Sequence, residues 1–321
     1  MTQPLVSIVI PLFNEEESLN ELFNWIKQTL EPQNITFEVV FVDDGSTDNS
    51  WNVIHALKAA NPHQIAAIRF MRNYGKSAAL NTAFQRVKGE FVVTMDADLQ
   101  DSPEEIEPLL NQIQSQSLDL VSGWKKKRYD PISKTIPTKL YNWATRRMSG
   151  IHLHDFNCGL KIYRTDVVKA IEVYGEMHRY IPVIAKRSGF GKIGERVVQH
   201  RARKYGQSKF GIERFMNGFL DLLTITFVSK FGKRPMHLFG SLGTLMFFCG
   251  FGLFAWIGGE KLWSMYMDTP AKNITEISGF YIALTAMIIG TQMFLAGFVA
   301  ELVARSSSNR NQYLIAEELS A

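Results

Sequence analysis

Two carboxylates, Asp96 and Asp98, follow an apolar run of β-favouring residues at 91–95, with a single residue between them. If this run forms a strand, both acids lie at its carboxyl end, which is where open α/β sheets bind their ligands. Carboxylate oxygens are preferred by hard cations such as Mg²⁺ and Mn²⁺, and phosphate oxygens often complete their coordination. The pair therefore predicts a metal site beside a phosphate group.

A strand-to-helix turn is the alternative interpretation of the same stretch. In that case Asp101 or Ser102 caps a helix that begins at Pro103, because short polar side chains satisfy the first free backbone N–H groups of a helix. The elements around the acid pair have to decide between the two interpretations.

Short apolar runs alternate with amphipathic stretches from residue 5 to about residue 125. This alternation predicts parallel βαβ units and a doubly wound, mainly parallel sheet of the Rossmann-like α/β class. The predicted strands are 6–10, 37–42, 65–70, 91–95 and 118–122, and the predicted helices are 16–30, 50–60, 77–87 and 104–115.

Polar residues follow each of the first four predicted strands, at 11–15, at 43–48, at 72–76 and at the acid pair. Because the connections of a doubly wound sheet bring such loops to one edge, we expect the four loops to line one crevice. For 43–48, a turn stabilised by its own side chains is an equally good interpretation. No GxGxxG or GxxxxGK[ST] motif occurs, which argues against a dinucleotide fold and a phosphate loop of those types.

A basic stretch begins with KKKR at 125–128, and an ordinary solvated charge run is one interpretation of it. Over about 133–149, apolar and aromatic residues alternate with cations at helical spacing, which predicts an amphipathic helix with a basic face. This helix either covers the protein surface or lies in a membrane interface, with Tyr141 and Trp143 at the level of the lipid headgroups.

Two long apolar stretches, 236–258 and 278–302, lie in the C-terminal third of the chain. At about 1.5 Å per residue, either one is long enough to cross the roughly 30 Å hydrocarbon core of a bilayer. A buried helix of a soluble domain is the competing interpretation. Lysine and arginine are concentrated before the first stretch and after the second, which predicts that both chain termini face the cytoplasm.

The overall composition excludes some classes of protein. With 46% hydrophobic residues over 321 positions the chain has ample material for a core, and a formal net charge of +4 is too small to predict nucleic-acid binding. The N-terminal residues have no basic region or cleavage site of a signal peptide, so we expect the region before the apolar stretches to stay in the cytoplasm.

Five motifs in this order resemble those of the inverting family 2 glycosyltransferases with the GT-A fold. They are closest to the polyprenyl- and dolichyl-phosphate sugar transferases of the bactoprenol glucosyltransferase type. The similarity extends to the two C-terminal apolar stretches and so covers nearly the whole chain. The motifs are FVDDGSTD at 41–48, RNYGKSAAL at 72–80, MDADLQDSPE at 95–104, DFNCGLK at 155–161 and HRARKYGQSK at 200–209.

The resemblance implies a role for each matching residue. Asp98 and Asp155 would be catalytic, with Asp155 near the acceptor phosphate as a base or as a positioning group, since a phosphate monoester is already ionised near neutral pH. A divalent cation, Mg²⁺ or Mn²⁺, would be held by Asp96, Asp98 and Gln100. The nucleotide sugar would contact Pro11, Asn14, Glu15, Asp43, Asp44, Asn73, Lys76, Asp96 and Ala97. The acceptor phosphate would contact Lys125, Arg128, Arg201, Arg203, Ser208 and Lys209.

The resemblance also implies the reaction. The chain lacks the Gln-x-x-Arg-Trp pentad of polymer-building relatives, so transfer of one sugar to a polyprenyl (undecaprenyl) phosphate is expected. UDP-glucose is the first expected donor, and GDP-mannose, UDP-GlcNAc and UDP-aminoarabinose remain alternatives. A family 2 transferase with another lipid acceptor, or a membrane protein that only binds nucleotide sugars, is also compatible with the sequence.

These expectations divide the chain into four parts. A GT-A domain is expected at 1–206, a juxtamembrane amphipathic segment at 207–235, two transmembrane helices within 236–302, and a cytoplasmic tail at 303–321. The whole would be a multi-pass protein of the inner membrane. Glycines in both apolar stretches permit close helix packing and suggest a homo-oligomer.

Overall fold

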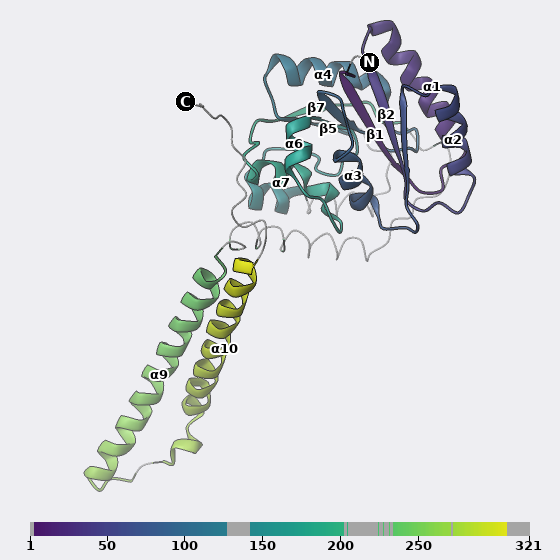
Figure 1. Cartoon of the computed structure of the whole chain (residues 1–321). Coiled ribbons are helices and arrows are strands. Elements are labelled where there is room, and N and C mark those ends of the chain that lie inside the picture. Colours follow the sequence, from purple (N-terminus) through teal and green to yellow (C-terminus); the bar gives the residue numbers. More distant parts are fainter. Residues whose placement is uncertain are drawn as a thin grey trace, which may run out of the picture. The chain divides into compact units, whose positions relative to one another are not determined.

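A computed structural model describes residues 3–126, 142–201, 204, 224, 227, 231, 234–270 and 272–306. The chain forms two compact units, Met1–Ile225 and Thr226–Ala321, which are described separately below (Figure 1).

A seven-stranded mixed sheet forms the centre of the first unit, in the order β3-β2-β1-β4-β6-β5-β7. All neighbours pair in parallel except β6, which is antiparallel to both β4 and β5. The five predicted strands are all present, while β6 and β7 were not predicted. The strands are β1 (Val6–Leu12), β2 (Phe37–Asp43), β3 (Ile65–Arg69), β4 (Phe91–Thr94), β5 (Leu120–Trp124), β6 (Lys161–Arg164) and β7 (Ile193–Val197).

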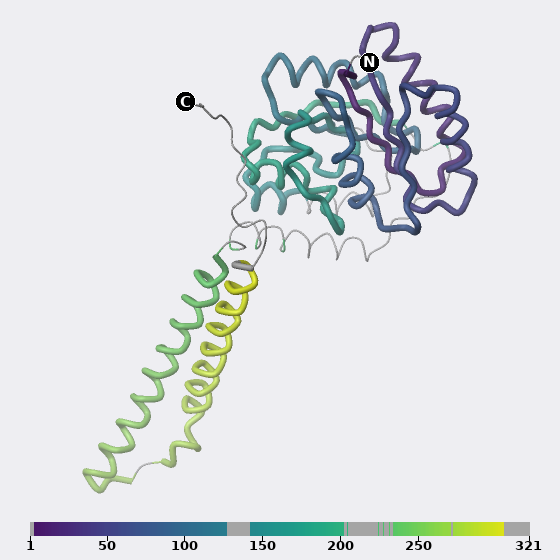
Figure 2. The backbone as a smooth tube through the Cα atoms, in the orientation of Figure 1, coloured from purple at the N-terminus to yellow at the C-terminus, as the bar shows by residue number. Residues whose placement is uncertain are grey.

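Helices cover both faces of the sheet, as expected for a doubly wound fold (Figure 2). On one face, α1 (Leu19–Leu30), α2 (Ser50–Ala60) and α4 (Ile106–Ser115) pack on strand residues such as Ile8 and Val39. The opposite face is covered by α3 (Lys76–Phe84), α6 (Thr165–Ala170) and α7 (Ile181–Arg187). Because both faces are covered, β1 and β2 are buried along almost their whole length and are mainly apolar, with Ser7 and Glu38 hydrogen-bonded to each other inside the sheet.

The strand register places the candidate site. Leu12 at the end of β1 pairs with Asp43 at the end of β2, and Val9 pairs with Thr94 at the end of β4. The loops that follow these strands therefore emerge at one edge of the sheet. Short 3-10 helices lie at Glu31–Gln33 (η1), Pro103–Glu105 (η2) and Met177–Tyr180 (η3). Of the helix predicted at 133–149, residues 142–149 are helical and the remainder lies outside the described residues.

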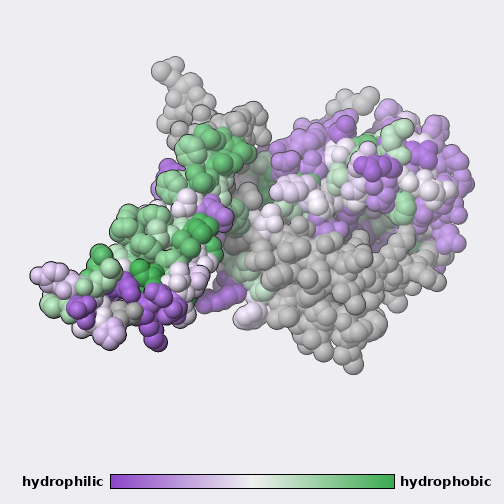
Figure 3. Space-filling view, turned by 90° about the horizontal axis from the view of Figure 1, so that it is seen from below, coloured by the Kyte–Doolittle hydropathy of each residue, from purple (hydrophilic) through white to green (hydrophobic). Residues whose placement is uncertain are grey.

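The second unit is a hairpin of two long apolar helices, α9 (Met236–Tyr266) and α10 (Ser278–Ser306), with a 3-10 turn, η4 (Ile274–Glu276), between them. Both helices are long and apolar enough to cross a membrane. Helix α9 continues beyond the predicted limit of 258 to Tyr266, because Glu260 and Lys261 end the apolar run without breaking the helix. Hydrophobic residues cover much of the surface of this unit (Figure 3). The predicted segment 207–235 and tail 303–321 lie largely outside the described residues.

Several glycines are used within the hairpin itself. A Cβ atom added to Gly290 would lie 2.7 Å from the carbonyl oxygen of Gly243, and one added to Gly250 would lie 2.7 Å from that of Ala283. The two backbones approach so closely only because these positions have no side chain. The glycines therefore account for packing inside one chain, and the homo-oligomer stays a prediction.

Replacing Gly290 with valine is expected to destabilise the hairpin by about 1–3 kcal/mol, because its side chain has no space between the helices. Gly252 is the matched control, since a Cβ there has no neighbour within 4 Å. Thermal unfolding of both variants in detergent would measure the difference. Equal unfolding midpoints for Gly290→Val and Gly252→Val would contradict this packing.

Candidate active site

The loop after β1 is bound to the loop after β2. The backbone N–H of Asn14 donates to Ser46 Oγ at 2.9 Å, and Asn14 Oδ1 accepts from the N–H of Thr47 at 2.8 Å. Asn14 adopts a left-handed backbone conformation (φ 57°), and the N–H of Glu15 donates to Ser50 Oγ at 3.0 Å. With Pro11 in β1, these predicted nucleotide-binding residues lie at the carboxyl edge of the sheet.

Asp43 and Asp44 both organise backbone. Asp43 Oδ1 accepts from the N–H of Ser46 at 2.8 Å, which is the self-stabilised turn of the alternative interpretation. Asp44 accepts from the N–H groups of Tyr74 and Gly75 at 2.7 and 2.9 Å and so fixes the loop after β3. Burial raises the pKa of Asp44 above its usual value, and these two hydrogen bonds act against the rise.

The loops after β2 and β3 also touch directly at Gly45. A Cβ on this residue would lie 2.5 Å from the carbonyl carbon of Arg72, and its φ of +74° favours glycine as well. Asn73 is exposed on the loop after β3, and α3 begins at Lys76 where this loop ends.

The acid pair follows β4 as predicted. Asp96 forms an ion pair with Lys76, and its carboxylate is 33% exposed. Burial acts to raise the pKa of Asp96, but Lys76 and Lys125 outweigh it and hold this pKa well below its usual value. Asp98 is half-buried, and its Oδ1 accepts from the N–H of Gln100 at 3.2 Å, whereas Ala97 between the acids is buried.

A glycine makes room for the Asp96 carboxylate. A Cβ on Gly159, in the loop before β6, would lie 2.6 Å from Asp96 Oδ2. The DFNCGLK motif at 155–161 thus packs against the Asp96 carboxylate through Gly159.

The third acid, Asp101, does not cap a helix. Ser102 occupies the N-cap position of η2 without a side-chain capping bond, and the fully buried Asp101 forms a 2.9 Å ion pair with Lys125. Burial lowers the pKa of Lys125, but the Asp101 carboxylate outweighs this effect and raises it above its usual value. With only 14% of its side chain exposed, Lys125 is not part of a solvated charge run.

The segment after β7 crosses the loop that carries Gln100. The N–H of Arg201 donates to the carbonyl oxygen of Gln100 at 3.0 Å, and Gln100 Nε2 donates back to that of Arg201 at 3.3 Å. Asp101 and His200 form an antiparallel bridge beside them. The Arg201 guanidinium lies over the ring of Trp25 at 4.3 Å. The predicted acceptor residues Arg128, Arg203, Ser208 and Lys209 lie outside the described residues.

Asp155 is buried in a rigid turn. Its backbone N–H and that of His154 both donate to Glu195 Oε1, at 3.1 and 2.7 Å, and its Oδ1 accepts from the N–H of Asn157 at 3.0 Å. His154 stacks on Trp124 with the ring centroids 4.0 Å apart. Glu195 on β7 therefore fixes the backbone that carries Asp155.

The structure adds residues to the site that the sequence did not predict. Lys161 on β6 is buried and donates to the carbonyl oxygen of Cys158, and burial lowers its pKa. Ser77 and His178 form a hydrogen-bonded pair beside Lys76. The position of Lys161 within the DFNCGLK motif was a usable signal, whereas no local pattern marks His178 or Glu195.

The residues present suit a hard cation in their chemistry. Among the described residues no three His, Cys, Asp or Glu side chains form a metal-binding group. Mg²⁺ is commonly bound through one or two carboxylates with substrate phosphates in the other positions, and Asp96 and Asp98 can supply two carboxylates. Asp96 is already paired with the Lys76 ammonium, so a divalent cation at this acid would share the carboxylate with that side chain.

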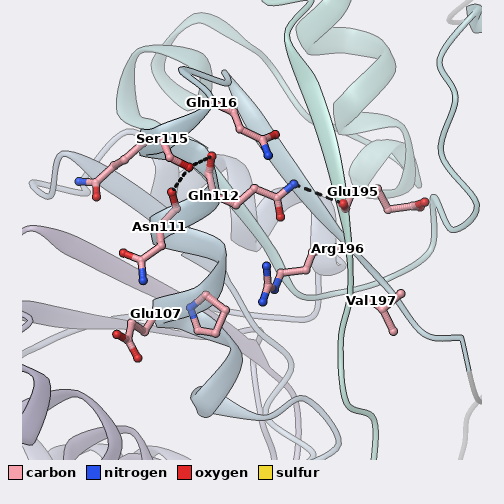
Figure 4. Close-up of a pocket in the computed structure, with 10 residues that line it drawn as sticks. Glu107, Asn111, Gln112, Ser115, Gln116, Glu195, Arg196 and Val197 are labelled. Carbon is pink, nitrogen blue, oxygen red and sulfur yellow. Dashed lines mark hydrogen bonds between the residues drawn. The ribbon is translucent and has the colours of Figure 1, made fainter.

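The acid pair does not line the pocket in Figure 4. The pocket has a volume of about 1090 Å³ and lies between α4 and the edge strand β7. Amide side chains such as Gln112 and Gln116 dominate its lining, and Gln112 Nε2 donates to the carbonyl oxygen of Glu195 at 3.4 Å. None of the predicted site residues lines it.

Comparison with known proteins decides the family. The family described as "Glycosyl transferase family 2" matches residues 7–172, which include the acid pair, β2 to β6 and all of β1 except its first residue. The chain belongs to glycosyltransferase family 2. It is therefore an enzyme that transfers sugars, with a mixed α/β sheet of GT-A type, as the sequence predicted.

Named relatives of this glycosyltransferase match it over most of their length. A dodecaprenyl-phosphate galacturonate synthase of Rhizobium johnstonii is 33% identical over 94% of this chain and 88% of its own. An undecaprenyl-phosphate 4-deoxy-4-formamido-L-arabinose transferase of Shewanella sediminis is 37% identical over 95% of this chain and 88% of its own. Together with the two apolar helices, these relatives indicate a membrane-associated enzyme.

Solved structures share the fold of this glycosyltransferase. Mannosyl-3-phosphoglycerate synthase from Rubrobacter xylanophilus has a TM-score of 0.58 at 14% identity, over 71% of this chain and 75% of its own. Glucosyl-3-phosphoglycerate synthase from Mycobacterium tuberculosis, in complex with Mg²⁺ and UDP, has a TM-score of 0.53 at 16% identity, over 71% of this chain and 80% of its own.

Proposed function

We propose that this glycosyltransferase moves one sugar from a nucleoside diphosphate donor to a polyprenyl phosphate at a membrane surface. The observation that carries the proposal is the acid pair at the tip of β4, in a family 2 domain whose chain continues into two long apolar helices. Relatives named for sugar transfer to dodecaprenyl and undecaprenyl phosphate support the acceptor.

The donor is expected at the carboxyl edge of the sheet. Asp96, Asp98 and Gln100 would hold Mg²⁺ or Mn²⁺, which neutralises charge on the departing diphosphate. Asp43 would accept a hydrogen bond from the nucleoside, and Asp44 would act through the loop that it fixes, since both of its oxygens already accept from backbone N–H groups. Lys76 would balance the anionic diphosphate.

The acceptor phosphate is expected beside Asp155. A phosphate oxygen of the acceptor attacks the anomeric carbon of the donor sugar. The bond between this carbon and the diphosphate breaks, and the configuration at the carbon is inverted. Because the acceptor phosphate is already ionised near neutral pH, Asp155 would orient it and need not remove a proton. Lys125 is paired with Asp101, and Arg201 stacks on Trp25. Each cation would therefore have to contact the acceptor phosphate and its present partner at the same time.

In the membrane, α9 and α10 would span the bilayer as a hairpin. Cations before α9 and after α10 favour a cytoplasmic location for the catalytic unit and both termini, where nucleotide sugars are made. The enzyme would then be a multi-pass protein of the inner membrane.

A donor panel tests the function and identifies the sugar. UDP-glucose, the first expectation from the sequence, would be compared with UDP-galacturonate, UDP-4-deoxy-4-formamido-L-arabinose, UDP-GlcNAc and GDP-mannose. The full-length enzyme in detergent is expected to release nucleoside diphosphate from one of them only when undecaprenyl phosphate and a divalent cation are present, and to form an acid-labile lipid-linked sugar. Binding without release, or an acid-stable lipid product, would contradict the proposal in favour of a binding protein or another acceptor.

A further inference from the structure

Ser77 and His178 join two elements that are distant in sequence. Ser77 is the second residue of α3, and His178 lies in η3, 101 positions further along the chain. The backbone N–H of His178 donates to Ser77 Oγ at 3.1 Å, and the same oxygen lies 3.1 Å from His178 Nδ1. The imidazole is thereby held in one orientation.

The serine hydroxyl determines which ring nitrogen of His178 carries the proton. Ser77 is 1% exposed, so its hydroxyl hydrogen needs a protein acceptor. Within the described part of the chain, His178 Nδ1 is the acceptor that lies in reach. Nδ1 therefore accepts from the hydroxyl, and the hydrogen of the neutral ring is on Nε2.

The surroundings of His178 disfavour the charged form of its ring. Burial lowers its pKa well below the usual value, and the nearby cations Lys76 and Arg179 act in the same direction. In its neutral form the ring has a single N–H donor, on Nε2, because Nδ1 accepts from Ser77.

Two contacts link His178 to the acid pair. Its hydrogen-bond partner Ser77 is the chain neighbour of Lys76, and Lys76 is bound to Asp96. His178 is half-buried, and its Nε2 has no hydrogen-bond partner among the residues that the structure describes. Three cations, Lys76, Arg179 and Lys161, contribute positive charge around the ring, which the Asp96 carboxylate partly opposes.

We propose that His178 Nε2–H donates a hydrogen bond to a diphosphate oxygen of the sugar donor, beside the Lys76–Asp96 pair. This inference rests on the proposed function. It assigns His178 to the substrate site and Ser77 to the positioning of its ring.

Two substitutions of His178 separate the effect of losing its Nε2 hydrogen-bond donor from the effect of losing its contact with Ser77. His178→Asn keeps an acceptor near the position of Nδ1 and removes the Nε2 donor, while His178→Gln keeps an N–H near the position of Nε2. His55→Asn is the control, because His55 is an exposed histidine on α2. UDP and GDP, each with Mn²⁺, would be titrated into the full-length protein in detergent, and the nucleotide that the wild type binds would be used throughout. Donor and acceptor KM values and thermal unfolding would be measured in parallel.

His178→Asn is expected to weaken nucleoside diphosphate binding about 10- to 100-fold, the usual range for a hydrogen bond to a charged group. His178→Gln should recover most of this affinity, and the acceptor KM and the unfolding midpoint should stay near the wild-type values in both variants. Wild-type diphosphate affinity in His178→Asn, or equal losses in the Asn and Gln variants, would overturn the inference. If the wild type binds neither nucleotide, the proposed function itself fails and the inference fails with it.

Discussion

Replacing Asp98 with asparagine is expected to lower the rate of sugar transfer about 1000-fold, equivalent to roughly 4 kcal/mol in the transition state. The substitution removes one of the two carboxylate charges at the tip of β4 and leaves a side chain of nearly the same size. Asp98 Oδ1 also accepts from the N–H of Gln100, and an asparagine oxygen can replace that contact. The loss should therefore reflect charge and not loop structure.

The measurement is nucleoside diphosphate release at saturating Mg²⁺ or Mn²⁺, together with Mn²⁺ affinity from electron paramagnetic resonance. Asp166→Asn provides the control, because Asp166 is an exposed acid on α6 at the other end of β6. Wild-type transfer by Asp98→Asn with either cation, or unchanged Mn²⁺ affinity, would remove Asp98 from the metal site.

Replacing Lys125 with methionine is expected to destabilise the first unit by about 3–5 kcal/mol, because the buried Asp101 carboxylate would lose its cation. Asp101 is fully buried, and the other basic group recorded near it, His200 Nδ1, is 3.9 Å from Oδ1. The double variant Lys125→Met/Asp101→Asn should recover much of the loss, since no charge is then left unpaired.

Denaturant unfolding of the full-length protein in detergent would measure these differences. Lys126→Met is the matched control, as Lys126 is exposed and should change stability by less than about 0.5 kcal/mol. If Lys125→Met leaves stability unchanged and only raises the acceptor KM, Lys125 belongs to the acceptor site and the ion pair has little structural weight.

The sequence predicted the strands that end at the site because their signal is local. Apolar runs such as 37–42 and 91–95 are bounded by polar turns. Because the strands are connected in parallel, the loops that follow them lie at the same edge of the sheet. The antiparallel β6 and the edge strand β7 have no such regular alternation around them. The order β4-β6-β5-β7 depends on contacts between residues that are distant in the chain.

The identity of the candidate site residues was easier to predict than their partners. Asp44 and Lys125 were recognised by their motifs, but the structure shows Asp44 holding backbone N–H groups and Lys125 paired with Asp101. Such partners come from loops on other strands, so no spacing in the sequence reveals them. His178 was missed for the same reason, because its contact with Ser77 joins positions 101 residues apart in the chain.

The crossing of residues 199–201 over the loop after β4 has a mechanical consequence. Gln199 N–H donates to Glu105 Oε1 at 3.0 Å, and Arg201 and Gln100 exchange two hydrogen bonds. This segment is also where the chain leaves the sheet on its way to the apolar hairpin. The loop that carries Gln100 and Asp101 is therefore fastened on two sides, by β4 before it and by residues 199–201 across it, so a displacement of Arg201 along the chain would move Gln100 with it.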